Sequence, residues 1–212
     1  IGIRHVEIAT GEMEQAAYTR NAPDRCYHCK TELYTQLEGL SEQFPGHVIV
    51  NGANADDLDD YRPGMRAARE HAVSSPLAEC GLTKADVRGL AAAWELPVWD
   101  KPATPCLSSR IAYGEEVTPE RLAMIDQAER LLYAEGFSQV RVRYHRGDLA
   151  RIEVSPAEVP RFANTEALER IRTGLQKLGF RFVTLDLQGF RSGSLNSLLG
   201  IENFSAARGV ES

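Results

Sequence analysis

HVIVNGANADD, residues 47–57, passes from a short apolar run into a polar turn. The apolar run predicts a buried β-strand, and the turn after it is rich in Asn, Asp and Gly. In open α/β sheets, ligands bind beyond the carboxyl ends of the strands, where such turns lie. We therefore expect this stretch to end one strand of a parallel sheet and to contact a ligand.

Short strands alternate with helices on both sides of this turn, from residue 1 to about residue 105. The predicted elements are strand Val6–Ile8, a helix from Lys30 to about Gln43, strand His47–Val50 and a helix that begins after Thr83. Such alternation is typical of an α/β fold on a parallel sheet.

The helix after Thr83 has a clear start signal. Thr83 and Asp86 have the spacing of a capping box, in which each side chain bonds the backbone of the other residue. Val87, Leu90, Ala91 and Trp94 fall on its apolar stripe. We expect that stripe to be buried.

The pattern changes after the proline-rich segment Lys101–Pro105. The predicted elements are a helix starting at Thr118-Pro119, strands Gln139–His145 and Leu149–Val154, a helix at about Thr165–Leu178 and strand Phe180–Leu187. This order predicts a small α+β domain with helices on one side of an antiparallel sheet. We place the first domain at residues 1–110 and the second at 111–212.

Composition excludes several classes of protein. The chain of 212 residues is 43% hydrophobic and 25% charged, with no apolar run long enough to cross a bilayer. A net charge of -6 argues against a protein that binds long nucleic acids. With only 4 cysteines and no signal-peptide pattern, a disulfide scaffold is disfavoured. We expect a cytoplasmic homo-oligomer with a small-molecule ligand, no membrane partner and no nucleic-acid partner.

Three cysteines are candidate metal ligands. Cys26 and Cys29 lie in CYHC, and Cys106 lies in TPCLSSR. Closed structural zinc or cluster sites use four ligands, so three thiolates leave one metal position open to a substrate atom. The pair could also be a redox dithiol, half of a zinc site or two ordinary thiols. Cys80 is expected to be a buried thiol without a ligand role.

Basic residues alternate along the strand Gln139–His145. A period of two places Arg141, Arg143 and His145 on one face, where the arginines could clamp a phosphate or carboxylate. The alternative is an outer face that simply meets water. Arg110 follows Cys106 by four residues, so an anion held by Arg110 would lie close to that thiol.

Carboxylates gather in the polar turn and just after it. The cluster consists of Asp56, Asp57, Asp59 and Asp60, directly before Tyr61 and Arg62. Mg²⁺ usually binds through one or two such acids together with substrate phosphates. The alternative is an acidic capping turn. Glu129, by contrast, is by itself an ordinary helix glutamate.

These motifs together resemble a known family. They are NAPDRCYHCK at 21–30, NGANADDLDDYRPG at 51–64, SPL at 75–77, KPATPCLSSR at 101–110 and RVR at 141–143. They look like the ATP-dependent sulfur transferases of the LarE type, which belong to the PP-loop ATP pyrophosphatase group. The resemblance implies an adenine-nucleotide α-hydrolase-like parallel-sheet domain followed by a smaller α+β domain for substrate binding or oligomerisation.

The resemblance also implies an activity. Enzymes of this type convert pyridinium-3,5-biscarboxylic acid mononucleotide to its bisthiocarboxylic form during assembly of the nickel-pincer nucleotide of lactate racemase. A substrate carboxylate attacks the α-phosphate of ATP, and a sulfur nucleophile then displaces AMP from the acyl-adenylate. Cys26, Cys29 and Cys106 resemble the branch in which three cysteines hold a [4Fe-4S] cluster. The alternative is a sacrificial Cys106 that gives up its own sulfur.

Residue roles follow from the same resemblance. Asp57 would lie near ATP and Mg²⁺, with Arg62 nearby. The substrate or phosphate side would be lined by Arg110, Glu129, Arg141 and Arg143. The ATP loop of the family, Ser-Gly-Gly-x-Asp-Ser, occurs nowhere in these residues. Because the chain opens without Met, we expect an N-terminal portion of the PP-loop domain to be missing and normal ATP binding to require it.

Two other functions fit part of the pattern. A PP-loop tRNA thiolase also activates an oxygen with ATP, but the acidic balance counts against a tRNA partner. A zinc- or cluster-binding interaction module would account for the cysteines and leave the Asp and Arg motifs unexplained.

Overall fold

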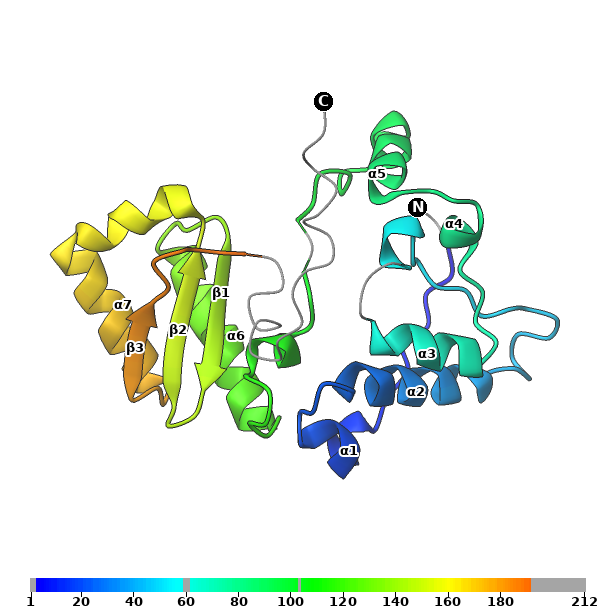
Figure 1. Ribbon diagram of the computed structural model, residues 1–212, viewed down its shortest axis with the longest axis horizontal. Coiled ribbons are helices and arrows are strands. Elements are labelled where there is room, and N and C mark those ends of the chain that lie inside the picture. The colour runs from blue at the N-terminus through cyan, green and yellow to red at the C-terminus, as the bar shows by residue number, and fades with distance from the viewer. Residues whose placement is uncertain (1–2, 59–61, 103, 192–212) are drawn as a thin grey trace. The chain divides into compact units, whose positions relative to one another are not determined.

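The computed structural model describes residues 3–58, 62–102 and 104–191 (Figure 1). The chain divides into two compact units. The first comprises Ile1–Tyr18, Pro23–Thr104 and Phe204–Ser212, and the second comprises Thr19–Ala22 and Pro105–Asn203. Residues 105–110 thus belong to the second unit, whereas the sequence analysis assigned them to the first. The C-terminal part of the predicted second domain, residues 192–212, lies outside the described residues.

Helices dominate the described part of the first unit. The elements are η1 (Glu12–Glu14), α1 (Ala16–Thr19), α2 (Arg25–Glu38), η2 (Ala55–Asp57), α3 (Pro63–Glu70), α4 (Pro76–Glu79) and α5 (Lys84–Ala93). Helices α2 and α3 pack on each other over a core of Tyr34, Ala67, Ala68 and Val73.

Helix α2 begins earlier in the chain than predicted. Its first residue is Arg25, because the Asp24 carbonyl already accepts the backbone N–H groups of Tyr27 at 2.8 Å and His28 at 3.4 Å. The Cys-x-x-Cys pair therefore lies in the first turns of a helix, not in a loop. A spacing of three residues puts Cys26 and Cys29 on neighbouring positions of the helix surface.

A glycine allows α3 to approach α2 closely. A Cβ at Gly64 would lie 3.0 Å from Cγ of Lys30 and 3.6 Å from the carbonyl oxygen of Cys26. The first turn of α3 therefore lies directly against the turn of α2 that carries Cys26.

The described residues of the first unit do not form the expected parallel sheet. The segment His47–Val50 contributes one isolated parallel bridge, Val50 to Ser74, and the Val6–Ile8 segment is not a strand. Val48 is 76% exposed. A lone bridge leaves strand edges without partners among the described residues, so the parallel-sheet fold stays a prediction.

The capping box of α5 is confirmed, but its buried face is not. The Thr83 N–H donates to Asp86 Oδ2 at 2.9 Å, and the Asp86 N–H donates to Thr83 Oγ1 at 3.2 Å. Leu90 is 40% exposed and Trp94 is 69% exposed, whereas Val87 and Ala91 are half-buried. The prediction of a buried stripe is therefore wrong for Leu90 and Trp94, and the described part of the chain covers this side of α5 only in part.

The second unit follows the predicted order closely. Its elements are η3 (Leu107–Arg110), α6 (Pro119–Ala134), β1 (Val140–His145), β2 (Leu149–Val154), η4 (Pro156–Ala163), α7 (Thr165–Lys177) and β3 (Phe182–Leu185). The Thr118 hydroxyl caps α6 by accepting the Arg121 N–H at 3.3 Å. The α-β-β-α-β order is confirmed.

The sheet of this unit is mixed, not antiparallel. Its order is β1-β2-β3, with β1 and β2 antiparallel and β2 and β3 parallel. Helix α7 connects β2 to β3 and carries the chain back to the end of the sheet where β2 starts. A helical crossover of this kind gives a parallel pair, so the prediction of a purely antiparallel sheet is wrong.

One face of the sheet forms the core with α6 and α7 (Figure 1). The apolar side chains of β1 and β2 that alternate toward the helices are Val140, Val142, Tyr144, Ala150, Ile152 and Val154, all buried. Ile125 and Leu132 of α6 and Leu175 of α7 are also buried. The other face of the sheet carries the charged residues.

The outer edge of β1 is satisfied by hydrogen bonds from outside the sheet. The Val142 N–H donates to Glu129 Oε1 at 3.1 Å, and the Tyr144 carbonyl accepts the Ala112 N–H at 2.9 Å. An edge strand with such partners has fewer free backbone groups for pairing with another chain.

None of the helices in the described residues combines the length and the apolar character that a membrane span requires.

The core between α6 and the sheet can be tested with a matched pair of leucines. Leu132 on α6 is fully buried, whereas Leu168 on α7 is 42% exposed. We expect Leu132→Ala to lower the free energy of unfolding of this unit by roughly 2–5 kcal/mol, because it removes buried methyl groups and leaves a cavity. Leu168→Ala should change it by less than about 1 kcal/mol. Amide hydrogen exchange of the β1–β2 hairpin measures both, and equal protection in the two variants would contradict this packing.

Candidate functional site

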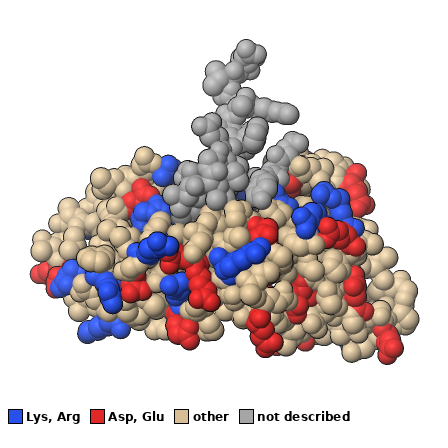
Figure 2. Space-filling model, turned by 60° about the horizontal axis from the view of Figure 1, so that its bottom comes forward, with Lys and Arg blue, Asp and Glu red and all other residues tan. Residues whose placement is uncertain are grey.

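A cluster of charged residues lies on the face of the sheet opposite the helices and continues past the edge of β1 to Arg110 and Glu129. Figure 2 shows acidic and basic side chains interspersed on the molecular surface that it presents. The cluster, in contrast, is withdrawn from solvent: Arg110 is 1% exposed, Arg141 5%, Arg143 7% and Glu153 0%. The interpretation of a solvated arginine face is therefore wrong. The members of this arginine cluster are Arg110, Arg141, Arg143 and Arg151, with the acids Glu129, Glu153 and Asp186.

Arg110 and Glu129 form a two-point ion pair. Arg110 Nε donates to Glu129 Oε1 at 3.0 Å, and Nη2 donates to Oε2 at 3.3 Å. The remaining nitrogen, Nη1, donates to the carbonyl oxygens of Pro105 at 2.5 Å and Cys106 at 3.0 Å. Arg110 thus fixes the turn that carries Cys106 against helix α6.

Arg143 reaches the same turn from β1. Its Nη1 donates to the Ser109 carbonyl at 3.0 Å. Its Nε and Nη2 both donate to Glu153 Oε2, at 3.0 and 2.9 Å. Glu153 Oε1 accepts from Arg151 Nη1 at 2.8 Å, and Arg151 also pairs with Asp186. One chain of ion pairs therefore crosses all three strands.

Arg141 lies between the other arginines of the cluster. Burial lowers the pKa of Arg141, and the positive charges of Arg110 and Arg143 lower it further, while Glu129 acts in the opposite direction. Its guanidinium carbon lies 5.1 Å from the centroid of the Phe190 ring, and Nη1 donates to the Val140 carbonyl at 2.6 Å. Burial is thus the main cause of the lowered pKa of Arg141, and the neighbouring charges act in both directions.

His145 is neutral in this environment. Burial lowers its pKa, followed by the charges of Arg151 and Arg143. Its Nε2 accepts the Nε–H of Arg151 at 3.1 Å, so the ring proton is on Nδ1. The predicted trio of basic groups on one strand face is in place, with two charged members and one neutral member.

Sequence reasoning missed three members of the cluster: Arg151, Glu153 and Asp186. Arg151 and Glu153 lie on β2, where the register pairs Arg141 with Glu153 and Arg143 with Arg151. The alternation of Arg151 and Glu153 with Ala150, Ile152 and Val154 was visible in the sequence. Pairing the two predicted strands antiparallel would have identified both residues.

Asp57 and Arg62 are adjacent in the first unit, as predicted. Arg62 Nη2 lies 2.8 Å from Asp57 Oδ1, and Asp57 Oδ2 accepts the Asn54 N–H at 3.0 Å. Asp57 therefore has a capping role, and its role toward Mg²⁺ stays a prediction. Asp59 and Asp60 lie outside the described residues.

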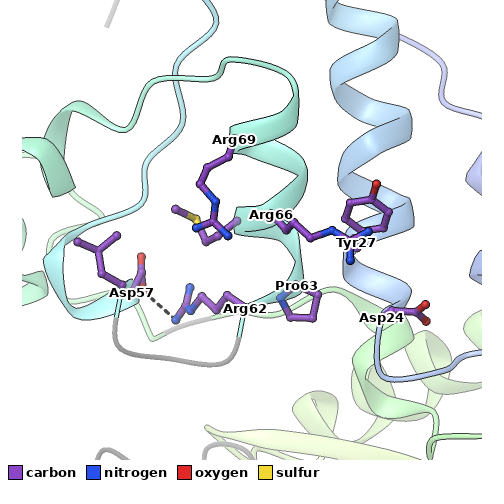
Figure 3. Close-up of a pocket in the computed structure, with 9 residues that line it drawn as sticks. Asp24, Tyr27, Asp57, Arg62, Pro63, Arg66 and Arg69 are labelled. Atoms are coloured by element: carbon purple, nitrogen blue, oxygen red, sulfur yellow. Dashed lines mark ion pairs between the residues drawn. The ribbon is translucent and has the colours of Figure 1, made fainter.

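A pocket of about 390 Å³ opens beside this ion pair (Figure 3). Its lining residues are Asp24, Tyr27, Asp57, Leu58, Arg62, Pro63, Met65, Arg66 and Arg69. The pocket thus extends from the polar turn to the start of the helix that carries the Cys-x-x-Cys pair. Neither Arg66 nor Arg69 was singled out from the sequence, although Arg62, Arg66 and Arg69 have the spacing of one helix stripe.

All four cysteines are free thiols. Cys26, Cys80 and Cys106 are exposed and Cys29 is half-buried, so the prediction that Cys80 is buried is wrong. Arg25 Nη2 lies 3.9 Å from the Cys26 sulfur. Cys26 and Cys29 belong to the first unit and Cys106 to the second. Among the described residues, no group of His, Cys, Asp or Glu side chains is arranged to hold a metal ion, and the three-thiolate site stays a prediction.

Three curated proteins are similar to this chain over most of its length. It is 46% identical over 199 residues to the uncharacterized protein slr1717 of Synechocystis sp., a match covering 94% of this chain and 74% of the relative. It is 40% identical over 179 residues to pyridinium-3,5-bisthiocarboxylic acid mononucleotide synthase of Lactiplantibacillus plantarum, covering 84% of this chain and 64% of the synthase. It is 34% identical over 175 residues to the uncharacterized protein MJ0830 of Methanocaldococcus jannaschii, a match covering 82% of this chain and 66% of that protein.

No protein-family model matches the chain. The chain spans 64% of the length of the synthase and 66% of that of the Methanocaldococcus protein. Its match to the Synechocystis protein extends over 74% of that relative. On this similarity, the chain belongs to the protein family that includes slr1717 of Synechocystis sp..

Proposed function

We propose that this protein is an ATP-dependent sulfur transferase that converts pyridinium-3,5-biscarboxylic acid mononucleotide to the bisthiocarboxylic acid mononucleotide. The proposal is supported by the 40% identity to a synthase named for that product. The observation that carries it is the direct connection between the arginine cluster and the turn of Cys106.

That connection consists of hydrogen bonds to the backbone of the turn. Arg110 donates to the Cys106 carbonyl at 3.0 Å, and Arg143 donates to the Ser109 carbonyl at 3.0 Å. The same two guanidiniums pair with the buried acids Glu129 and Glu153. An anion bound at the cluster would therefore lie beside an exposed thiol whose backbone is held rigid.

The chemistry of the cluster suits an anionic ligand. Arg141 and Arg143 are buried, and guanidinium groups bind phosphate and carboxylate oxygens through two parallel hydrogen bonds. The substrate carries both groups, so one could be clamped while the other is presented to the reacting sulfur.

The chemistry needs activation because a carboxylate is a poor electrophile. In the proposed reaction, a substrate carboxylate oxygen bonds to the α-phosphorus of ATP, and the bond to the pyrophosphate leaving group breaks. A sulfur nucleophile then attacks the acyl carbon, AMP leaves with its electron pair, and a thiocarboxylate remains. Arg141 and Arg143 would hold the substrate during both steps, and Arg110 would keep the Cys106 turn in position.

The nucleotide would be held in the first unit, at the polar turn. The side chain of Asp57 is 12% exposed and pairs with Arg62. The Asp57 carboxylate would bind Mg²⁺, and the Arg62 guanidinium beside it would bind phosphate oxygens.

The proposed sulfur donor is an iron–sulfur cluster held by three cysteines. Cys26 and Cys29 lie one helical turn apart, Cys106 is exposed, and all three are free thiols. They would hold a [4Fe-4S] cluster, which would supply sulfide at an iron without a protein ligand. The alternative donor is the sulfur of Cys106 itself.

The role of the arginine face can be tested without removing its charge. We expect Arg141→Lys to weaken binding of pyridinium-3,5-biscarboxylic acid mononucleotide about tenfold. Lysine keeps the positive charge but cannot donate two parallel hydrogen bonds to one phosphate or carboxylate group. The matched control is Arg146→Lys, where the side chain is 89% exposed. Isothermal titration measures both affinities, with thermal unfolding as the check on folding. If the two variants bound the substrate equally well, Arg141 would have no part in the clamp.

The sulfur donor can be identified by the mass of the protein after one turnover. For the cluster route, we expect an unchanged polypeptide mass in anaerobically purified full-length protein that has made one equivalent of thiocarboxylate. Loss of the mass of hydrogen sulfide at Cys106 would instead identify a sacrificial cysteine. Cys80→Ala is the control, since an exposed thiol outside both motifs should leave the product yield unchanged.

A further inference from the structure

One hydrogen bond fixes the protonation state of a histidine at the edge of the arginine cluster. His145 is the last residue of β1, and its Nε2 lies 3.1 Å from Nε of Arg151 on β2. An arginine nitrogen can only donate, so the imidazole nitrogen must accept. A doubly protonated imidazole would carry an N–H at this nitrogen, and two donors would face each other. The bond therefore exists only while His145 is neutral.

Arg151 connects this histidine to the rest of the cluster. Its Nη1 donates to Glu153 Oε1 at 2.8 Å and pairs with Asp186. Glu153 Oε2 accepts from Nε and Nη2 of Arg143, at 3.0 and 2.9 Å. One buried carboxylate therefore shares its charge between two arginines, and one of these arginines is oriented by His145.

This sharing decides how far Arg143 is available to a ligand. Glu153 is 0% exposed, and a buried carboxylate that loses a cationic partner is costly. While Arg151 holds Oε1, Arg143 can turn one edge of its guanidinium toward an anion and Glu153 keeps a partner. If Arg151 lets go, more of the charge of Glu153 has to be neutralised by Arg143.

The surroundings of the imidazole favour its neutral form. The charged groups that act on it in the described part of the chain are Arg143 on β1, Arg151 and Glu153 on β2, and Glu115 in the segment before α6. Burial lowers the pKa of His145 from its ordinary value of 6.5, the two arginines lower it further, and the two glutamates act in the opposite direction. Glu115 also pairs with Arg146 and Arg121. The neutral form therefore predominates at and above pH 6.5.

We propose that His145 is a positioning residue that makes anion binding at the arginine cluster dependent on pH. Neutral His145 keeps Arg151 on Glu153, which leaves Arg143 available to a phosphate or carboxylate. Protonation breaks the bond to Arg151 and holds Arg143 on Glu153, so the affinity for the anion falls as the pH falls. The inference rests on the proposed function for the identity of the anion, the substrate mononucleotide.

Long-range proton–nitrogen NMR correlations of the imidazole in the full-length protein test the first step. We expect the His145 ring to carry its proton on Nδ1 and to have a pKa below its ordinary value. Arg151→Gln should raise that pKa, because it removes a positive charge that lowers it. A proton on Nε2, or a pKa unchanged by Arg151→Gln in a folded protein, would overturn the proposal.

Titration with pyridinium-3,5-biscarboxylic acid mononucleotide from about pH 8 to about pH 5 tests the second step. We expect His145→Gln to bind like the wild type at the high end, because glutamine Oε1 can accept the Arg151 N–H and never becomes charged. As the pH falls, the wild type should lose about tenfold more affinity than His145→Gln, with a midpoint at the pKa found by NMR. The ligand phosphate also titrates in this range, but it does so equally for both proteins.

His145→Leu and His5→Gln complete the set. Leucine offers Arg151 no acceptor, so His145→Leu should bind about tenfold more weakly at the high end and lack the additional loss at low pH. His5 is exposed and belongs to the first unit, so His5→Gln should keep the wild-type pH profile. Identical profiles in wild type and His145→Gln, or tighter binding on protonation, would contradict the proposal.

Failure of the proposed function is distinguishable from failure of this inference. If the protein does not act on the mononucleotide, the ligand binds to none of these proteins at any pH. The NMR measurement needs no ligand, so it still decides whether His145 positions Arg151.

Discussion

The buried ion pair between Arg110 and Glu129 is the contact on which the second unit depends. It joins three elements at once, because Glu129 on α6 also accepts the Val142 N–H of β1 and Arg110 also holds the carbonyls of Pro105 and Cys106. Removing one partner of such a pair leaves a buried charge unpaired, at a cost of about 3–5 kcal/mol. The position of the Cys106 turn is therefore tied to the integrity of the helix–sheet core.

The arginine cluster is better explained by binding than by stability. Buried ion pairs seldom stabilise a fold more than apolar residues of the same volume would, since both charges must be desolvated. The four arginines and three acids of the cluster therefore add little stability to the fold. The arrangement does keep several donors fixed before a ligand arrives, so no side-chain ordering is needed when an anion binds.

The sequence predicted the second unit far better than the first. Thr118-Pro119 and the alternation in residues 140–154 are local signals, and the structure confirms the elements they predict. The parallel pairing of β2 and β3 depends on a crossover through α7, which no local pattern encodes. In the first unit, the strand at residues 47–50 and the apolar stripe of α5 need partners that local sequence does not identify. The candidate site shows the same contrast. Asp57 and Arg62 were predicted from their motif, whereas Glu153 was identified only through the pairing of β1 with β2, and Arg69 only through its position on helix α3.

The central claim is that the arginine cluster holds the anionic substrate beside Cys106. A crystal structure of the full-length protein with pyridinium-3,5-biscarboxylic acid mononucleotide tests it most directly. The account predicts a phosphate or carboxylate oxygen within hydrogen-bond distance of the Arg141 or Arg143 guanidinium, with a second carboxylate directed toward the Cys106 turn. A mononucleotide bound elsewhere, with Arg143 still closed on Glu153 and no ligand at Arg141, would contradict it.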